Sequence, residues 1–139
     1  MNEELVQIQE YSGEGYKPLI DYDTWRVAIL RFIDELRPEN IEHLECHLET
    51  DEVFVLLAGQ CTLFIGTPDN DDDLGIEAIR MEPLKLYNIR QGVYHSHTLS
   101  QDASVLIVEN RDTAASNSQR AKLTKAQKTQ IISLGKFKQ

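Results

Sequence analysis

All four histidines of the chain fall in two short stretches, one just before a continuous apolar run and one just after Gly92. In a β-strand, residues two apart share a face, so the two histidines of each stretch would point to one side of their strand. A barrel that pairs the two strands would gather these and neighbouring carboxylates inside it. Imidazoles and carboxylates at that density are typical of a site for a divalent metal. The converging side chains are His43, Glu45, His47, Glu52, His95 and His97.

The segments that would position these residues are typical of β-strands. They are short, rich in β-branched and aromatic residues, and separated by turn signals. The continuous apolar run 53–57 suits a strand that is buried on both faces. It should form a hairpin with 61–65 across the turn at Gly59. The predicted strands are 25–33, 53–57, 61–65, 76–81, 85–89, 93–99 and 105–109. Several short strands of this kind predict an all-β sandwich or barrel.

The pattern changes after Asn110. Residues 114–119 are polar and typical of a linker, and Thr124 with Gln127 then forms a capping-box sequence. We expect a short helix within 120–135 that ends at Gly135 and docks on an acidic surface of the barrel or of a twin subunit. Its inward stripe would be Ala126, Ile131 and Leu134. The chain is thus divided into a barrel at 1–110, followed by a basic linker and short helical appendage at 111–139.

Residues 45–59 resemble the first motif of the cupin family, in which two histidines one residue apart precede a glutamate and a glycine at fixed spacings. His47, Glu52 and Gly59 match the second histidine, the glutamate and the glycine. Gly92 and His95 match the glycine and histidine of the second cupin motif. The resemblance implies a small single-domain cupin: an all-β jelly-roll barrel, here with a short C-terminal helix.

Three positions depart from the cupin motifs. The first histidine is replaced by Glu45, the proline of the second motif by Arg90, and the asparagine after it by Leu99. Carried over position by position, the metal ligands that the family resemblance implies are Glu45, His47, Glu52 and His95. His43 and His97 would line the same pocket. The implied cofactor is one divalent metal, namely manganese, iron, nickel or zinc, since a glutamate in place of a histidine can still ligate a hard ion.

The cupin resemblance does not specify a reaction, because cupins include dioxygenases, isomerases, decarboxylases, lyases and plain ligand binders. Two interpretations stay open. The first is a metal-dependent enzyme that acts on a small polar metabolite. The second is a non-catalytic small-molecule-binding or structural cupin with a vestigial metal site, in which His47 and His95 are structural histidines. Measuring the metal content of the purified protein separates the two.

The charge distribution limits the classes of molecule that the chain is expected to bind. The net charge is −9, and it is unevenly spread. Residues 111–139 hold seven Lys or Arg and one Asp, a balance of +6, against −15 for residues 1–110. An acidic body repels nucleic acid and anionic membranes. We therefore expect no nucleic acid and no membrane among its partners. The cupin resemblance implies a small-molecule ligand and a homodimer, formed by pairing edge strands, which would also cover exposed strand edges.

Cys46 and Cys61 do not make a disulfide framework, so we expect two reduced thiols in the core. Cys46 lies on the opposite strand face from its neighbour His47, which argues against a nucleophilic dyad. The acidic stretch 69–73 is predicted to be an exposed turn without an ion of its own. The chain has no apolar run of membrane-spanning length and an acidic N-terminus unlike a secretory signal, which predicts a cytoplasmic protein.

Overall fold

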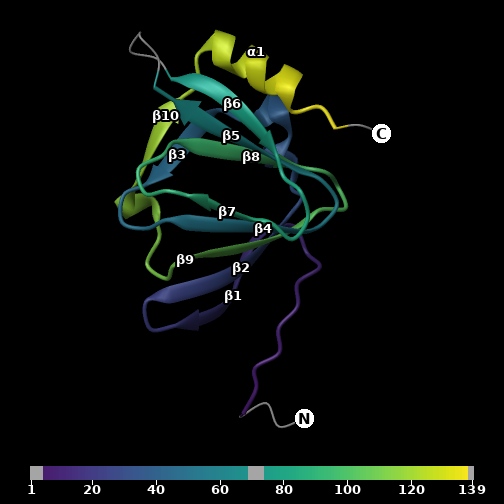
Figure 1. Cartoon of the computed structure of the whole chain (residues 1–139), viewed down its shortest axis with the longest axis vertical. Coiled ribbons are helices and arrows are strands. Elements are labelled where there is room, and N and C mark those ends of the chain that lie inside the picture. Colours follow the sequence, from purple (N-terminus) through teal and green to yellow (C-terminus); the bar gives the residue numbers. More distant parts are fainter. Residues whose placement is uncertain (1–4, 69–73, 138–139) are drawn as a thin grey trace.

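The computed structural model describes residues 5–68 and 74–137, which form two five-stranded antiparallel sheets packed face to face (Figure 1). The first sheet has the order β1 (Gly15–Tyr22), β2 (Trp25–Arg31), β9 (Ser104–Asn110), β4 (Glu52–Ala58) and β7 (Leu86–Ile89). The second has the order β10 (Ser118–Lys122), β3 (His43–His47), β8 (His95–Leu99), β5 (Cys61–Thr67) and β6 (Gly75–Arg80). Three 3-10 turns, Asp34–Leu36, Pro38–Asn40 and Ala115–Asn117, and the helix α1 (Lys125–Leu134) complete the described chain. The predicted all-β fold with a short C-terminal helix is confirmed.

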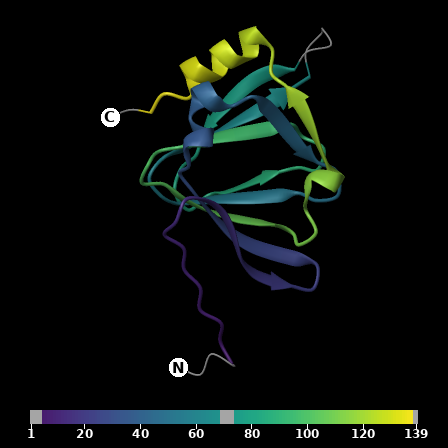
Figure 2. The same ribbon diagram turned by 180° about the vertical axis from the view of Figure 1, so that it is seen from behind.

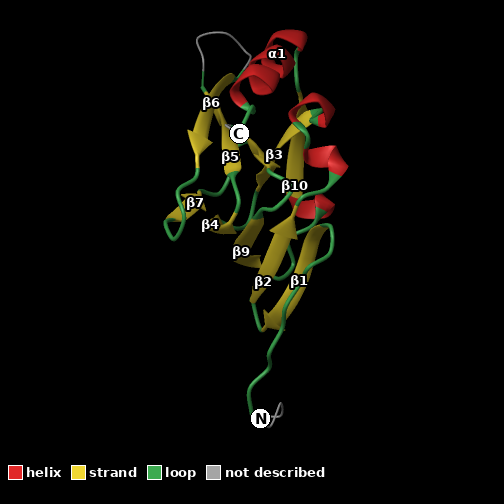
Figure 3. Cartoon of the chain, turned by 90° about the vertical axis from the view of Figure 1, so that its right-hand side faces the viewer, coloured by secondary structure: helices red, strands yellow, loops and turns green. Residues whose placement is uncertain are grey.

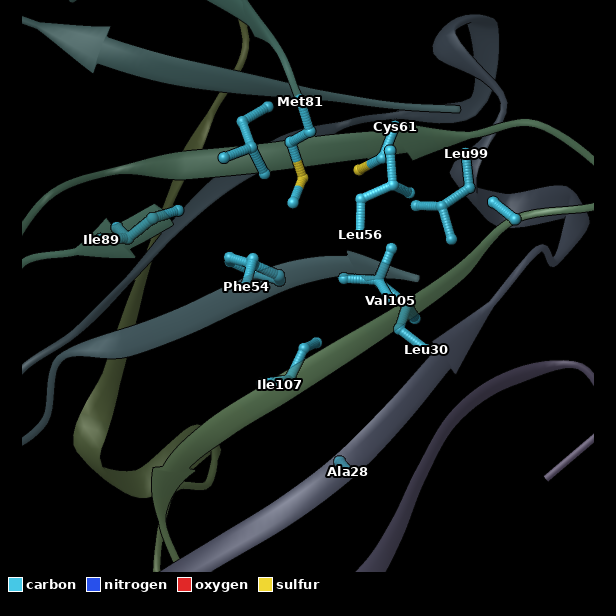
Figure 4. Packing of buried hydrophobic residues seen from close by; sticks show 12 residues of the cluster. Ala28, Leu30, Phe54, Leu56, Cys61, Met81, Ile89, Leu99, Val105 and Ile107 are labelled. Carbon is cyan, nitrogen blue, oxygen red and sulfur yellow. The ribbon is translucent and has the colours of Figure 1, made fainter. Parts of the chain in front are cut away.

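The core lies between the two sheets, where alternate side chains of each strand meet (Figure 4). Phe54 and Leu56 of β4 and Val105 and Ile107 of β9 point toward the second sheet, whose Cys61 faces them. This packing follows from the period of two along a strand, which sends every second residue inward.

All seven predicted strands are present, but the expected hairpin between residues 53–57 and 61–65 is wrong. β4 pairs with β7 and β9, whereas β5 pairs with β6 and β8 in the other sheet. The turn at Gly59 therefore carries the chain from one sheet to the other. Its φ of +71° suits glycine, and an added Cβ would lie 2.6 Å from the backbone of Ala103. The glycine of the first motif is thus required both by conformation and by space.

Strand β4 is not buried on both faces as the sequence suggested. Phe54 and Leu56 are buried, while Val53 and Val55 are only partly buried and Leu57 is 49% exposed. The continuous apolar run gives no alternation from which the inner face can be recognised, so the sequence could not distinguish one buried face from two.

The outer face of the second sheet is covered by α1 (Figure 2). Ile131 is fully buried there against Leu44 and Phe64. The capping box of Thr124 and Gln127 and the stop at Gly135 are confirmed. The described chain contains no helix long and apolar enough to cross a membrane.

The inward stripe predicted for the helix is only partly right. Ala126 and Leu134 are exposed, and the buried residues are Gln127 and Ile131. Gln127 turns inward because its amide is used twice: it accepts a hydrogen bond from the backbone N–H of Thr124 and donates one to the carbonyl of Leu74. A hydrophobicity pattern ignores such hydrogen bonds, which is why it placed the wrong residues inside.

Three strands were not among the seven predicted: β3, which carries the histidine stretch 43–47, and two edge strands. β1 pairs with β2 at one edge of the first sheet, and β10 pairs with β3 at one edge of the second. The start of β10 replaces part of the polar linker expected at 114–119. Both expected core thiols, Cys46 and Cys61, are free and buried. The acidic stretch 69–73, for which an ion-free turn was predicted, lies outside the described residues.

Candidate functional site

Three buried side chains meet at the ends of three strands. His47 is the last residue of β3, Glu52 the first of β4 and His95 the first of β8. Oε1 of Glu52 lies 2.9 Å from Nε2 of His95 and 3.4 Å from Nε2 of His47. One ligand atom from each residue lies within 4.8 Å of the others. Two imidazole nitrogens and a carboxylate oxygen at this spacing can ligate a single divalent ion.

The hydrogen bonds behind the two imidazoles orient them toward this point. Nδ1 of His95 lies 3.0 Å from the carbonyl oxygen of Val93, which can only accept, so Nδ1 carries a proton. In a neutral imidazole Nε2 then presents its lone pair to Oε1 of Glu52, which is also an acceptor. Nδ1 of His47 pairs with Oγ of Ser118 at 2.8 Å. Such partners behind a histidine are typical of metal ligands.

The ionisation of the cluster follows from its contacts. The hydrogen bond with Glu52 raises the pKa of His47 above its ordinary value. Burial acts to raise the pKa of Glu52, but hydrogen bonds from His47 and His95 outweigh it and hold this pKa well below its usual range. Glu52 is therefore a carboxylate at neutral pH. These hydrogen bonds require a proton on each imidazole nitrogen that faces Glu52, and a metal ion at the same point would take the place of those protons. The donor set thus fits a divalent metal.

The cluster lies in the wall of a cavity of about 740 Å³. All six residues singled out in the sequence line this cavity: His43, Glu45, His47, Glu52, His95 and His97. Only three of them form the close cluster. Glu45 is directly opposite His95 in the pairing of β3 and β8, but its carboxylate binds Arg120 at 3.1 Å. His43 is exposed.

His97 occupies a different position from the three clustered residues. It packs against the ring of Phe54, and its Nδ1 is buried without a hydrogen-bond partner among the described residues. Burial lowers the pKa of His97 to about 4, so its imidazole is neutral at physiological pH. A neutral imidazole at the cavity wall can donate to or accept from a bound polar molecule.

Sequence reasoning missed three further carboxylates that line the cavity, Glu35, Glu42 and Glu109, of which Glu109 interacts with Glu52. Glu109, near the end of β9, lines the cavity and accepts a hydrogen bond from the hydroxyl of Tyr16 on β1. Burial, with the neighbouring Glu52 carboxylate, raises the pKa of Glu109 to about 8. A signal for Glu109 did exist, because it shares strand parity with the inward residues Val105 and Ile107. Tyr16 had none, because its strand was not predicted.

Strand β10 also contributes side chains to the site. Ser118 is directly opposite His47 and Arg120 directly opposite Glu45 in the pairing of β10 with β3. Residues directly opposite each other in a sheet share a face, so both side chains point to the cavity side. Strand β10, which the sequence pattern assigned to the linker and tail, therefore orients His47 through Ser118 and neutralises Glu45 through Arg120.

No family model matches the sequence, and a search of curated proteins finds no match. Solved structures do resemble it. Streptomyces Pac13, described as a unique nucleoside dehydratase, matches with a TM-score of 0.57 and 7% identity over 84% of this chain and 87% of that one. A cupin-2 domain protein from Shewanella frigidimarina matches with a TM-score of 0.50 and 20% identity, over 73% of this chain and 85% of that one. The structure of CapF matches with a TM-score of 0.54 and 15% identity, over 81% of this chain and 33% of the CapF chain. At such identities the likeness is one of fold.

Proposed function

We propose that this chain, which has the cupin jelly-roll fold, is a divalent-metal-dependent enzyme that acts on a small polar metabolite in its cavity. The observation that carries the proposal is the geometry of His95. Its Nδ1 donates to the Val93 carbonyl, so in a neutral imidazole its Nε2 faces the Glu52 carboxylate with a lone pair that a metal ion can accept. With His47 beside them, three buried ligand atoms converge where a cation is favoured.

His47, Glu52 and His95 would hold the ion, and three protein ligands leave coordination positions open to a substrate oxygen or water. A bound divalent ion supplies Lewis acidity, which polarises a carbonyl or hydroxyl group. Glu45 is not needed as a ligand, because Arg120 already binds its carboxylate. We propose manganese, iron, nickel or zinc as candidates, since the mixed nitrogen and oxygen donor set suits each of them.

The remaining cavity residues would handle protons and orient the substrate. Glu109 is protonated at neutral pH, so it can donate a proton to a developing oxyanion or leaving group. Tyr16 holds the Glu109 carboxyl in place. His97 is neutral and can hydrogen-bond a substrate without adding charge. A cavity of about 740 Å³ is within the usual range for a small-molecule site.

The decisive experiment is elemental analysis of protein purified without an affinity tag. We expect about one equivalent of a transition metal per chain, lost in Glu52→Gln and retained in Glu45→Gln. Glu45→Gln is the matched control, because it removes a carboxylate from the same cavity but outside the three-residue cluster. A metal-free wild-type protein that also fails to bind added metal would contradict the proposal.

One observation favours the alternative of a ligand-binding cupin with a vestigial metal site. Glu45 replaces a motif histidine and is paired with Arg120, so one of the family's four ligand positions is withdrawn. If the protein binds small polar molecules in calorimetry equally well with metal and with chelator, and transforms none of them, the binding function is the better description.

A further inference from the structure

The wall of the cavity is rich in glutamate and poor in unpaired cations. Among the described residues, its lining contains one arginine and no lysine, against five glutamates. The arginine is Arg120, whose Nε already lies 3.1 Å from Oε2 of Glu45. Two lysines close to Glu42, Lys122 and Lys128, lie outside the lining, and Lys128 binds Glu42 at 2.6 Å. The lining glutamates are Glu35, Glu42, Glu45, Glu52 and Glu109.

The rim of the cavity carries negative charge as well. Part of the rim is formed by the three 3-10 turns, which lie along one side of the two sheets beside β10 (Figure 3). These turns contribute Glu35, Asn40 and Ala115 to the lining. Glu35 is exposed, and no ion pair within the described chain neutralises it. A carboxylate or phosphate inside this cavity would therefore lack an unpaired arginine or lysine from the lining, and burying an unpaired anion is costly.

His97 is a polar side chain of the same wall that lacks a partner. Its Nδ1 is buried with no hydrogen-bond partner among the described residues, and the described chain gives Nε2 no hydrogen bond either. The ring packs against Phe54, with the two ring centroids 5.6 Å apart. Buried polar atoms in native proteins are almost always hydrogen-bonded, so an exception points to a missing partner. His97 lines the cavity, which is where such a partner would lie.

The burial of Nδ1 decides which nitrogen of His97 serves a ligand. A proton on the buried Nδ1 would stay without an acceptor whatever the cavity contains. Buried N–H groups without an acceptor are rarer than unsatisfied acceptors, which favours the tautomer with its proton on Nε2. On a residue that lines the cavity, this N–H is a donor for an oxygen atom of the ligand.

His97 is close enough to the three-residue cluster for one small molecule to contact both. His95 and His97 are two residues apart on β8, so their side chains leave the same face of the strand roughly 6.6 Å apart. The ring of Phe54 lies beside both imidazoles. A molecule of the size of a small metabolite can therefore contact the cluster at one end and His97 at the other.

We propose that the cavity selects an uncharged polar ligand, one of whose carbonyl or hydroxyl oxygens accepts a hydrogen bond from Nε2 of His97. Glu45 has a separate part in this selection. By neutralising Arg120, it removes the one arginine of the described lining that could hold a carboxylate or phosphate. This ligand class deepens the proposed function and rests on it only for the use of this cavity as the ligand site, since the selection needs no metal ion.

The first test compares ligands that differ mainly in charge. Full-length protein labelled with ¹⁵N-histidine and treated with a chelator is mixed with matched probes: nicotinamide and nicotinate, lactamide and lactate, ribose and ribose 5-phosphate. The chelator removes the attraction that a metal ion would exert on an anion. At least one neutral probe should shift the His97 signals, and its anionic partner should bind about tenfold more weakly or worse. A chain that holds no metal can still give this result, so the test is separate from the metal content.

The second test identifies the donating nitrogen. The ¹⁵N spectrum of the free wild-type chain should show the His97 proton on Nε2, with the signal assigned by its proximity to the Phe54 ring. A glutamine amide can donate from near the Nε2 position, whereas an asparagine amide lies near Nδ1. His97→Gln should therefore keep the affinity for the neutral probe within about threefold, and His97→Asn should lower it about tenfold.

The third test releases Arg120 from its partner. Glu45→Gln leaves His97 in place but frees the guanidinium, so the anionic probes should gain about threefold or more in affinity while the neutral probes change little. Glu82→Gln is the matched control, because it removes the carboxylate partner of Lys85 outside the cavity lining. This control should change the affinity for neither class of probe.

Any one of four results would overturn the proposal. The first is an acid that binds the chelator-treated chain as tightly as its matched neutral probe. The second is a His97 proton on Nδ1. The third is a set of neutral probes that all leave the His97 signals unmoved. The fourth is a Glu45→Gln chain in which the anionic probes gain no affinity.

Discussion

Oε1 of Glu52 lies 2.9 Å from Nε2 of His95, although both groups are acceptors when the imidazole is neutral and the carboxyl is ionised. The proton on Nδ1 of His95 is held by the Val93 carbonyl, so the ring cannot satisfy Glu52 by changing tautomer. Both residues are buried in the cavity wall. A buried carboxylate without a cation or donor is costly. The contact therefore favours positive charge at this point, which a proton on the imidazole supplies in the metal-free protein and a divalent ion would supply when bound.

The first prediction concerns the three-residue cluster. Glu52→Gln removes the negative charge that attracts the ion while keeping the shape of the side chain. Loss of an outer-shell partner typically costs 10–100-fold in metal affinity, so loss of this ligand should cost more than about 100-fold. Competition titration with a chromophoric chelator measures the effect. Glu45→Gln should change the affinity by far less, and equal effects of the two variants would assign the ion to a wider ligand set.

The second prediction concerns Ser118, which orients His47 from strand β10. Oγ of Ser118 is 2.8 Å from Nδ1 of His47, and the two residues are directly opposite each other in the sheet. Ser118→Ala should lower metal affinity by about 10-fold or more, with little change in the unfolding midpoint. Ser133→Ala, at an exposed position of α1, is the control. An unchanged affinity in Ser118→Ala would show that the Ser118 hydroxyl does not orient His47.

The third prediction is the pH dependence of stability in the metal-free protein. The pKa of Glu109 is about 8 in the folded chain and about 4.5 when unfolded, so folding takes up a proton between these values. Its contribution to the free energy of unfolding falls as pH rises through this window. The contribution of His47, whose pKa is raised, is also lost as pH rises through its folded value. His97 acts oppositely, but only between its folded value of about 4 and 6.5.

The free energy of unfolding should therefore fall from pH 6.5 to pH 8, where Glu109 and His47 act in the same direction. Each proton adds at most about 1.4 kcal/mol per pH unit. Urea denaturation in the presence of chelator measures the slope. Glu109→Gln, which mimics the protonated acid, should flatten it. A stability that rises with pH over this interval would show that Glu109 is ionised in the folded chain.

Sequence spacing was sufficient to find the centre of the site because its residues are fixed by local rules. Strand parity relates His43, Glu45 and His47, and the motif spacing relates His47 to Glu52. The fixed spacing between Gly92 and His95 matched the second cupin motif and so placed His95 at the same site. What spacing could not show is which carboxylate faces the imidazoles. Arg120 draws Glu45 away, and that contact exists only because β10 returns to pair with β3.

The residues that were missed depend on pairings between distant parts of the chain. Tyr16 reaches Glu109 across 93 positions of sequence, and Ser118 reaches His47 across 71. The strands that carry Tyr16 and Ser118 are edge strands: β10 is mostly polar and β1 is interrupted by Lys17 and Pro18, so both lack the apolar run that made the central strands recognisable. The same limit explains the hairpin error, since a tight turn indicates where the chain reverses but not which sheet it enters.

The last prediction tests the docking of the C-terminal helix on the barrel. Ile131 is fully buried against the outer face of the second sheet, while the adjacent Ile132 is exposed. Ile131→Ala should lower the free energy of unfolding by about 2–5 kcal/mol, because it leaves a cavity between α1 and the sheet. Ile132→Ala removes the same atoms from an exposed position and should cost less than about 0.5 kcal/mol. Urea unfolding followed by circular dichroism compares the two. Lys128 binds Glu42 at 2.6 Å, but this ion pair is partly exposed and should contribute little. Equal, small effects of both alanine variants would mean that the helix is loosely held and that its basic residues are free to reach another partner.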